Sequence, residues 1–140
     1  MEKILNKKKI FNDPVYGFIT VKSDLIFDII EDPYFQRLRR IKQLGMADYV
    51  YPGAIHTRFH HALGAMHLMN EALDHLQKKG VFLFDAEIEA TLIAILLHDI
   101  GHGPFSHALE NSILNNVHHE DISTLLMEQL NKKFKGALTL

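Results

Sequence analysis

The segment 86–100 constrains the fold of this chain more than any other part of the sequence. Its residues are apolar on nearly every side, above all from Ile93 to Leu97. A helix that is hydrophobic all round has to be surrounded by other elements of the same protein. Asp85 can cap this helix, and Glu87 and Glu89 lie in its first turn, where the helix dipole favours negative charge. The pattern therefore predicts a central buried helix with further helices packed around it.

Other segments carry the signals that begin and end helices. Ser23 can cap one helix, which Asp32 and Pro33 stop. Asp32 is then the N-cap and Pro33 the first residue of a second helix, which is predicted to run to about Leu44 and to end at Gly45. Helical periodicity also predicts a long helix over 59–79, a short helix over 104–114 and a last helix over 120–134.

The N-terminal segment instead favours β-structure. The tripeptide Asn12-Asp13-Pro14 is typical of a turn, and residues 17–21 are rich in strand formers. No repeat, linker or low-complexity stretch interrupts the sequence that follows. We therefore predict an all-α fold, in which a short β-hairpin or arm over 1–22 precedes a helical bundle over 23–140.

The composition excludes several classes of protein. The length of 140 residues suits one domain. The net charge of −2 gives no electrostatic reason to expect nucleic acid or an anionic membrane as a partner. The absence of cysteine excludes disulfides and thiolate zinc sites, and the longest apolar run falls far short of the ~20 residues that span a bilayer. With no secretory signal visible at the N-terminus, these features predict a soluble, cytoplasmic protein.

The clustered histidines indicate a candidate functional site. All 10 lie between His56 and His119, and the predicted central helix ends in His98-Asp99. Burying a carboxylate beside imidazoles is costly unless another group compensates. His61, near the start of the long helix, could bring a third ligand to a cation there.

These three residues predict a site for one divalent ion. Imidazole and carboxylate ligands without thiolate suit Mn, Fe, Co, Ni or Zn, and Mg is also considered. The alternative is a buried, hydrogen-bonded His-Asp pair with no metal. Gly101 and Gly103 favour the metal, because they leave the backbone beside the site free of side-chain bulk.

Longer sequence motifs make the resemblance to a known family specific. His61 with His98-Asp99 resembles the start of the H…HD…D signature of HD-domain phosphohydrolases. The wider series is similar to the deoxynucleoside triphosphate triphosphohydrolases, which include bacterial dGTPase-like enzymes and animal enzymes with a sterile-alpha-motif domain. Its strings are FNDP at 11–14, FQRLR at 35–39, IKQLG at 41–45, RFHH at 58–61, HDIGHGPFSH at 98–107 and HE at 119–120.

The resemblance implies a role for each matching residue. His61, His98 and Asp99 would bind the metal, and His102 and His107 would line the phosphate pocket. His119 would be the general acid for the leaving 5′-oxygen, with Glu110 where the family often has an aspartate bonded to that histidine. Arg58 would contact the phosphate or base, and Gln43 and Leu44 the sugar and base. A nucleotide activator site between the subunits of a homo-oligomer would use Lys9, Asn12, Gln36 and Arg39.

The implied function is metal-dependent hydrolysis of a deoxynucleoside triphosphate, such as dGTP, to deoxynucleoside and inorganic triphosphate. One alternative is another HD-superfamily nucleotidase or phosphodiesterase. The other is a truncated, non-catalytic module that binds nucleotide or mediates oligomerisation. The family's final aspartate lies roughly a hundred residues beyond the His-Asp pair, and Asp121 is too close to His119 to replace it. The chain is therefore expected to be the N-terminal part of a longer protein.

Overall fold

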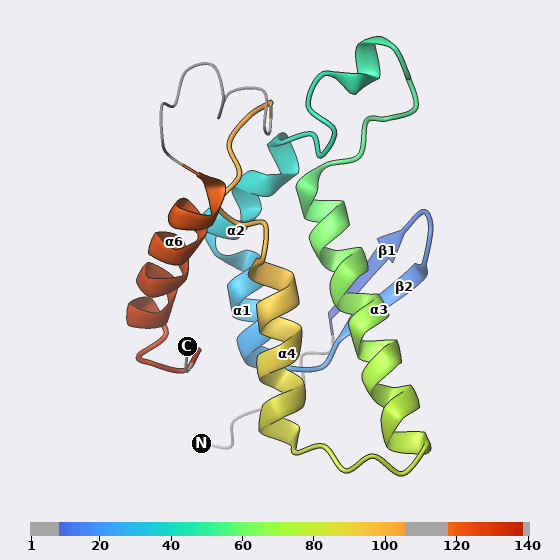
Figure 1. Cartoon of the computed structure of the whole chain (residues 1–140), viewed down its shortest axis with the longest axis vertical. Coiled ribbons are helices and arrows are strands. Elements are labelled where there is room, and N and C mark those ends of the chain that lie inside the picture. The colour runs from blue at the N-terminus through green and yellow to red at the C-terminus, as the bar shows by residue number, and fades with distance from the viewer. Residues whose placement is uncertain (1–8, 106–117, 139–140) are drawn as a thin grey trace.

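A computed structural model describes residues 9–105 and 118–138 of the chain. Two long helices, α3 (Arg58–Lys78) and α4 (Asp85–Leu97), lie side by side along most of the length of α4 (Figure 1). The shorter helices α1 (Asp24–Glu31) and α2 (Pro33–Gln36) pack with them, and α6 (His119–Lys133) lies on the other side of α4 in this view. The predicted all-α class is confirmed.

Two predicted helix caps are present. The Ser23 hydroxyl accepts a hydrogen bond from the Ile26 N–H at 3.2 Å, so it caps α1. The Asp32 carboxylate accepts from the Tyr34 N–H at 2.9 Å and caps α2, with Pro33 as its first residue. Each cap satisfies one of the N–H groups that the first turn of a helix leaves without an intrahelical partner.

The predicted extent of the second helix is wrong. α2 ends at Gln36 and continues only as a 3-10 helix, η1 (Arg37–Arg40), not to Leu44. Ile41 is extended and buried, and its carbonyl accepts a hydrogen bond from the Arg58 N–H at 2.8 Å. This pairing of Ile41 with the start of α3 takes the chain out of the helix before the predicted end.

The predicted β-arm is a hairpin. β1 (Lys9–Asp13) pairs antiparallel with β2 (Gly17–Val21), and Lys9 lies opposite Val21. The Asp13 carboxylate accepts hydrogen bonds from two N–H groups of the turn, and Gly17 has a φ of +74°. Ile19 and Val21 are buried in the same hydrophobic core as the helices. The division of the chain at residues 22 and 23 stays a prediction.

The central helix differs from its predicted form. Its N-cap is Phe84, whose N–H donates to the Glu87 carboxylate at 3.0 Å, rather than Asp85. It ends at Leu97 and not near residue 100. It is also not buried all round, because Ala86, Ala90 and Ala94 follow one another at four-residue spacing on an exposed face. Alanine exposes little apolar area, so this face is tolerable in water.

The remaining helices agree closely with the sequence. α3 and α6 each begin and end one residue before the predicted bounds. A second 3-10 helix, η2 (Ala47–Tyr49), lies in the loop before α3. Most of the helix predicted over 104–114 lies outside the described residues. None of the described helices combines the length and apolar character required to cross a bilayer.

Candidate metal centre

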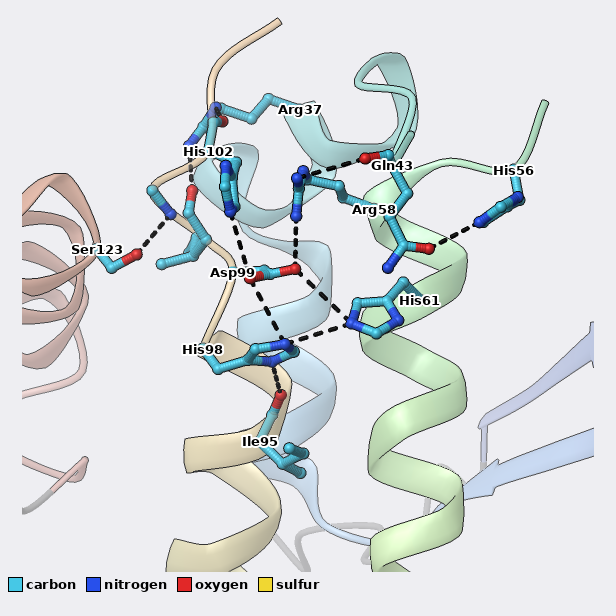
Figure 2. A network of polar contacts seen from close by, with 12 residues as sticks. Arg37, Gln43, His56, Arg58, His61, Ile95, His98, Asp99, His102 and Ser123 are labelled. Carbon is cyan, nitrogen blue, oxygen red and sulfur yellow. Dashed lines mark hydrogen bonds and ion pairs between the residues drawn. The ribbon is translucent and has the colours of Figure 1, made fainter. Parts of the chain in front are cut away.

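Three of the predicted ligands converge at one end of the α3–α4 pair. His61 comes from the first turns of α3, and His98 and Asp99 from the turn that follows α4 (Figure 2). The two Nε2 atoms of His61 and His98 are 3.3 Å apart. The oxygens of Asp99 lie 3.7 Å from His61 Nε2 and 3.6 Å from His98 Nε2. All three donor groups therefore face a common point.

A backbone contact orients one of these ligands. His98 Nδ1 lies 2.6 Å from the carbonyl oxygen of Ile95. A carbonyl can only accept, so Nδ1 carries the proton and Nε2 directs its lone pair toward His61. Metal-binding histidines almost always make such a bond with their other ring nitrogen.

The spacing and the chemistry of these groups fit a cation. Two nitrogens that each lie about 2.1 Å from a tetrahedral ion are separated by about 3.4 Å, close to the 3.3 Å between His61 and His98. The same residues form a donor cluster in which every ligand atom lies within 4.8 Å of the others.

Asp99 is the electrostatic centre of the site. Its side chain is 14 % exposed, and its Oδ2 lies 2.6 Å from Nη1 of Arg58. Burial by itself raises the pKa of Asp99, but a hydrogen bond from His102 and the nearby charges of His98 and Arg58 outweigh it and hold that pKa well below its usual range. The carboxylate is therefore ionised over the whole physiological pH range.

His61 is adapted to donate a lone pair. Burial lowers its pKa; Asp99 opposes this shift, while His98, Arg58 and His56 act in the same direction as burial. The lowered pKa keeps the imidazole neutral near pH 7, which is the form that binds metals.

Two further predicted residues lie beside this cluster. His102 is 2 % exposed, and its Nε2 lies 3.5 Å from Oδ1 of Asp99. The ring of His119, at the start of α6, stacks on the His102 ring with a centroid distance of 3.8 Å and an interplanar angle of 14°. Asp99 thus connects the first donor cluster to a second one made with His102 and His119.

A hollow of about 650 Å³ opens next to His61. Gln43 lines it, and its Oε1 lies 2.7 Å from Nε2 of His56. Leu44 is 51 % exposed and is not among the residues that line the hollow. Arg58 is buried against Asp99 instead of lining it. The substrate-binding roles of Gln43, Leu44 and Arg58 stay predictions.

The other predicted residues fall into two groups. His107 and Glu110 lie outside the described residues. Of the predicted activator residues, Lys9 lies 3.6 Å from Glu31, and Gln36 accepts a 2.7 Å hydrogen bond from Arg39. Asn12 is exposed on β1 opposite Phe18. Their role as an activator site, and the homo-oligomer it implies, stay predictions.

The structure also brings two residues to the site that the sequence did not indicate. Arg37 belongs to a basic run that is by default a solvated helix face, yet its guanidinium donates to the backbone of the turn that carries His98 and Asp99. Ser123 of α6 accepts a hydrogen bond from the N–H of Gly101 at 2.9 Å. Nothing in the local sequence distinguishes Arg37 from the arginines that follow it.

This fold and site define a class of helical proteins in which a His-Asp pair and a histidine of the neighbouring helix surround one point. The chain belongs to the HD domain family, whose model matches residues 58–138, more than half of its length. The family resemblance predicted from the sequence is confirmed.

Several known proteins are similar to this chain. It is 44% identical over 119 residues to the uncharacterized protein YwfO of Bacillus subtilis, covering 85% of this chain and 27% of that protein. It is 39% identical over 130 residues to the deoxynucleoside triphosphate triphosphohydrolase SAMHD1 of Homo sapiens, covering 87% and 21%. A crystal structure of a phosphohydrolase from Bacteroides thetaiotaomicron matches with a TM-score of 0.92 and 57% identity, covering 95% of this chain and 33% of the other. The chain spans about a quarter of the length of these curated relatives.

Proposed function

We propose that this chain carries the metal centre of a phosphohydrolase that cleaves deoxynucleoside triphosphates to deoxynucleoside and inorganic triphosphate. The observation that carries the proposal is the convergence of His61, His98 and Asp99, with His98 oriented by the Ile95 carbonyl. The names of the SAMHD1 relatives and of the Bacteroides phosphohydrolase support the substrate class and the reaction.

His61, His98 and Asp99 would hold one divalent ion. Two imidazoles and one carboxylate favour a transition metal, Mn, Fe, Co, Ni or Zn, over Mg. When bound, the ion lowers the pKa of water and neutralises charge on the phosphate oxygens. The low pKa of Asp99 and the neutral His61 keep these ligands in their binding forms at neutral pH.

The stacked histidines would move the protons. Water would attack the α-phosphorus and release a proton to solvent as the bond from phosphorus to the 5′-oxygen breaks. That oxygen must gain a proton to leave as the deoxynucleoside hydroxyl. His119 is the more accessible of the stacked pair and would donate this proton, because imidazole is the side chain that proteins most often use as a general acid. His102, buried beside Asp99, would orient the α-phosphate or the attacking water.

The hollow beside His61 would take the nucleoside. Of the three proposed ligands His61 lines it, and its walls combine apolar side chains with Asp13, His56, His60 and the Gln43 amide. An amide can donate to or accept from a sugar hydroxyl or a base edge. Gln43 would therefore fix the orientation of the sugar relative to the metal.

Product analysis tests this function. The Mn²⁺-loaded chain, and the longer protein where one is encoded, are incubated with dGTP, and inorganic triphosphate and deoxyguanosine are quantified. We expect both products in equal amounts, and a loss of at least about 100-fold in rate for His98→Ala and Asp99→Ala. His75→Ala, an exposed histidine on α3, is the matched control and should retain activity.

Other outcomes would select an alternative. Monophosphate and pyrophosphate as the only products would indicate a different HD-superfamily nucleotidase. Nucleotide binding without turnover in every form of the protein would indicate a non-catalytic binding module.

A further inference from the structure

We propose that Arg37 is a positioning residue of the metal centre: its guanidinium fixes the backbone of residues 100–102 so that Asp99 and His102 face the ion. The inference rests on the proposed metal centre and adds a residue that acts on it through the backbone. Figure 2 shows Arg37 reaching this turn from the side opposite α6.

The first evidence is a pair of hydrogen bonds from one side chain. Nη1 of Arg37 donates to the carbonyl oxygen of His102 at 2.8 Å, and Nη2 donates to the carbonyl oxygen of Ile100. These carbonyls belong to the peptide groups on either side of Gly101-His102. Because the guanidinium is planar and rigid, the two bonds together fix the relative orientation of both peptide groups.

The position of Arg37 also suits its charge. The two carbonyl oxygens that it binds carry partial negative charge, and hydrogen bonds from a charged donor are stronger than those between neutral groups. Arg37 is partly buried, and burial lowers its pKa, whereas Arg39 and Arg40 on the same 3-10 helix are exposed. The cost of desolvating this guanidinium is therefore offset by the carbonyls of the turn.

The opposite face of the turn is fixed by α6. The N–H of Gly101 donates to Oγ of the buried Ser123 at 2.9 Å. A Cβ at Gly101 would clash with the carbonyl oxygen of His119 and the backbone nitrogen of Ser123. The turn thus lies between Arg37 and α6, and loss of Arg37 would release one of its two faces.

A shift of this turn would reach the metal ligands directly. Asp99 precedes Ile100, and the His102 N–H donates to the carbonyl of Asp99 at 3.2 Å. The buried His102 ring is also held between Asp99 and the His119 ring. A change in peptide orientation at residue 100 or 102 therefore moves a carboxylate ligand and the imidazole bonded to it.

Cobalt titration of the 140-residue chain tests the proposal, with visible absorption reporting the ligand geometry. The variants are Arg37→Met, Arg37→Lys and, as a matched control on the same 3-10 helix, Arg40→Met. We expect Arg37→Met to weaken the Co²⁺ Kd at least about tenfold and to change the absorption spectrum, because partners outside the ligand shell typically contribute 10–100-fold in affinity. The Co²⁺ Kd of Arg37→Lys should lie between those of the wild type and Arg37→Met, since one ammonium cannot reproduce both hydrogen bonds of the guanidinium. Arg40→Met should match the wild type.

The results that would refute the role of Arg37 differ from those that would refute the proposed function. Unchanged Kd and spectrum in a folded Arg37→Met would refute the role of Arg37. If Arg37→Met does not fold, Arg37→Lys decides, and wild-type binding and spectrum there would refute the role as well. If the wild type binds no Co²⁺, the metal centre itself is refuted.

Amide hydrogen exchange of the metal-free chain then tests whether Arg37 fixes the turn in the absence of metal. Arg37→Lys should accelerate exchange at Gly101 and His102, and unchanged exchange would contradict the role of Arg37.

Discussion

Arg58 and Asp99 form an ion pair of 2.6 Å that joins the first turn of α3 to the turn after α4. The side chains are only 5 % and 14 % exposed, so each charge has lost most of its water and depends on the other. The same carboxylate faces His61 and His98. Asp99 therefore serves the fold and the proposed metal centre at once.

Removing the arginine should destabilise the metal-free chain. In Arg58→Met the Asp99 carboxylate stays buried without the guanidinium that lies 2.6 Å from it, which typically costs about 3 kcal/mol or more. Urea unfolding in EDTA measures this change. With saturating Mn²⁺ the loss should be smaller, because the ion supplies the missing positive charge. An equal loss with and without Mn²⁺ would show that no cation compensates Asp99.

Stability should also depend on pH through His61. Burial lowers its folded-state pKa, while the unfolded chain keeps a value of about 6.5. As pH falls below about 6.5, the unfolded state takes up the proton first, so the free energy of unfolding decreases until the folded-state pKa is passed. In EDTA, unfolding at pH 7.5, 6.5 and 5.5 should show a shallower decrease for His61→Gln than for the wild type. Parallel pH profiles would refute this contribution.

Two glycines of the turn should respond differently to alanine. Gly101→Ala places a Cβ against the backbone of α6, which cannot retreat without moving His119. We expect a loss of about 3 kcal/mol or failure to fold, at the upper end of overpacking costs. Gly103→Ala is the matched control, because a Cβ there meets no atom within 4 Å. Thermal unfolding compares the two, and equal melting temperatures would contradict the close packing of the turn on α6.

Asp32 should contribute more as a helix cap than as a charge. It caps α2 and also pairs with Lys133, whose side chain is 55 % exposed. The Asp32 side chain is only 1 % exposed, but its lysine partner lies mostly in solvent and an asparagine amide fills the same buried space. Asp32→Asn, which keeps a good capping residue and loses only the ion pair, should therefore cost less than about 1 kcal/mol. Asp32→Ala loses both and should cost about 2 kcal/mol. A loss in Asp32→Asn that exceeds half of the loss in Asp32→Ala would reverse this assignment.

Much of the helical framework could be predicted from local signals. Ser23 and Asp32 are strong capping residues, and the buried positions of α3, such as Ala62, Met66 and Leu73, follow helical spacing. The end of the second helix could not be predicted, because the contact that extends Ile41 comes from the start of α3. Such a pairing depends on tertiary structure and leaves no trace in the local pattern.

The candidate site could likewise be predicted from the sequence only in part. His98 and Asp99 are conspicuous because polar residues end an apolar helix, and His61 lies at the start of the other long helix. Arg37 could not be distinguished from Arg39, because only the rotation of a short 3-10 helix decides which arginine points inward. A single turn of that kind has no hydrophobic periodicity from which to read its orientation.

The most direct test of the central claim is the metal stoichiometry and affinity of the purified chain, measured by equilibrium dialysis against Mn²⁺ or Co²⁺ followed by elemental analysis. The convergence of His61, His98 and Asp99 predicts one ion per chain, an affinity at least about 100-fold weaker in His98→Ala and Asp99→Ala, and no change in His75→Ala. No saturable binding by the wild type, or equal binding by the His98→Ala and Asp99→Ala variants, would contradict it.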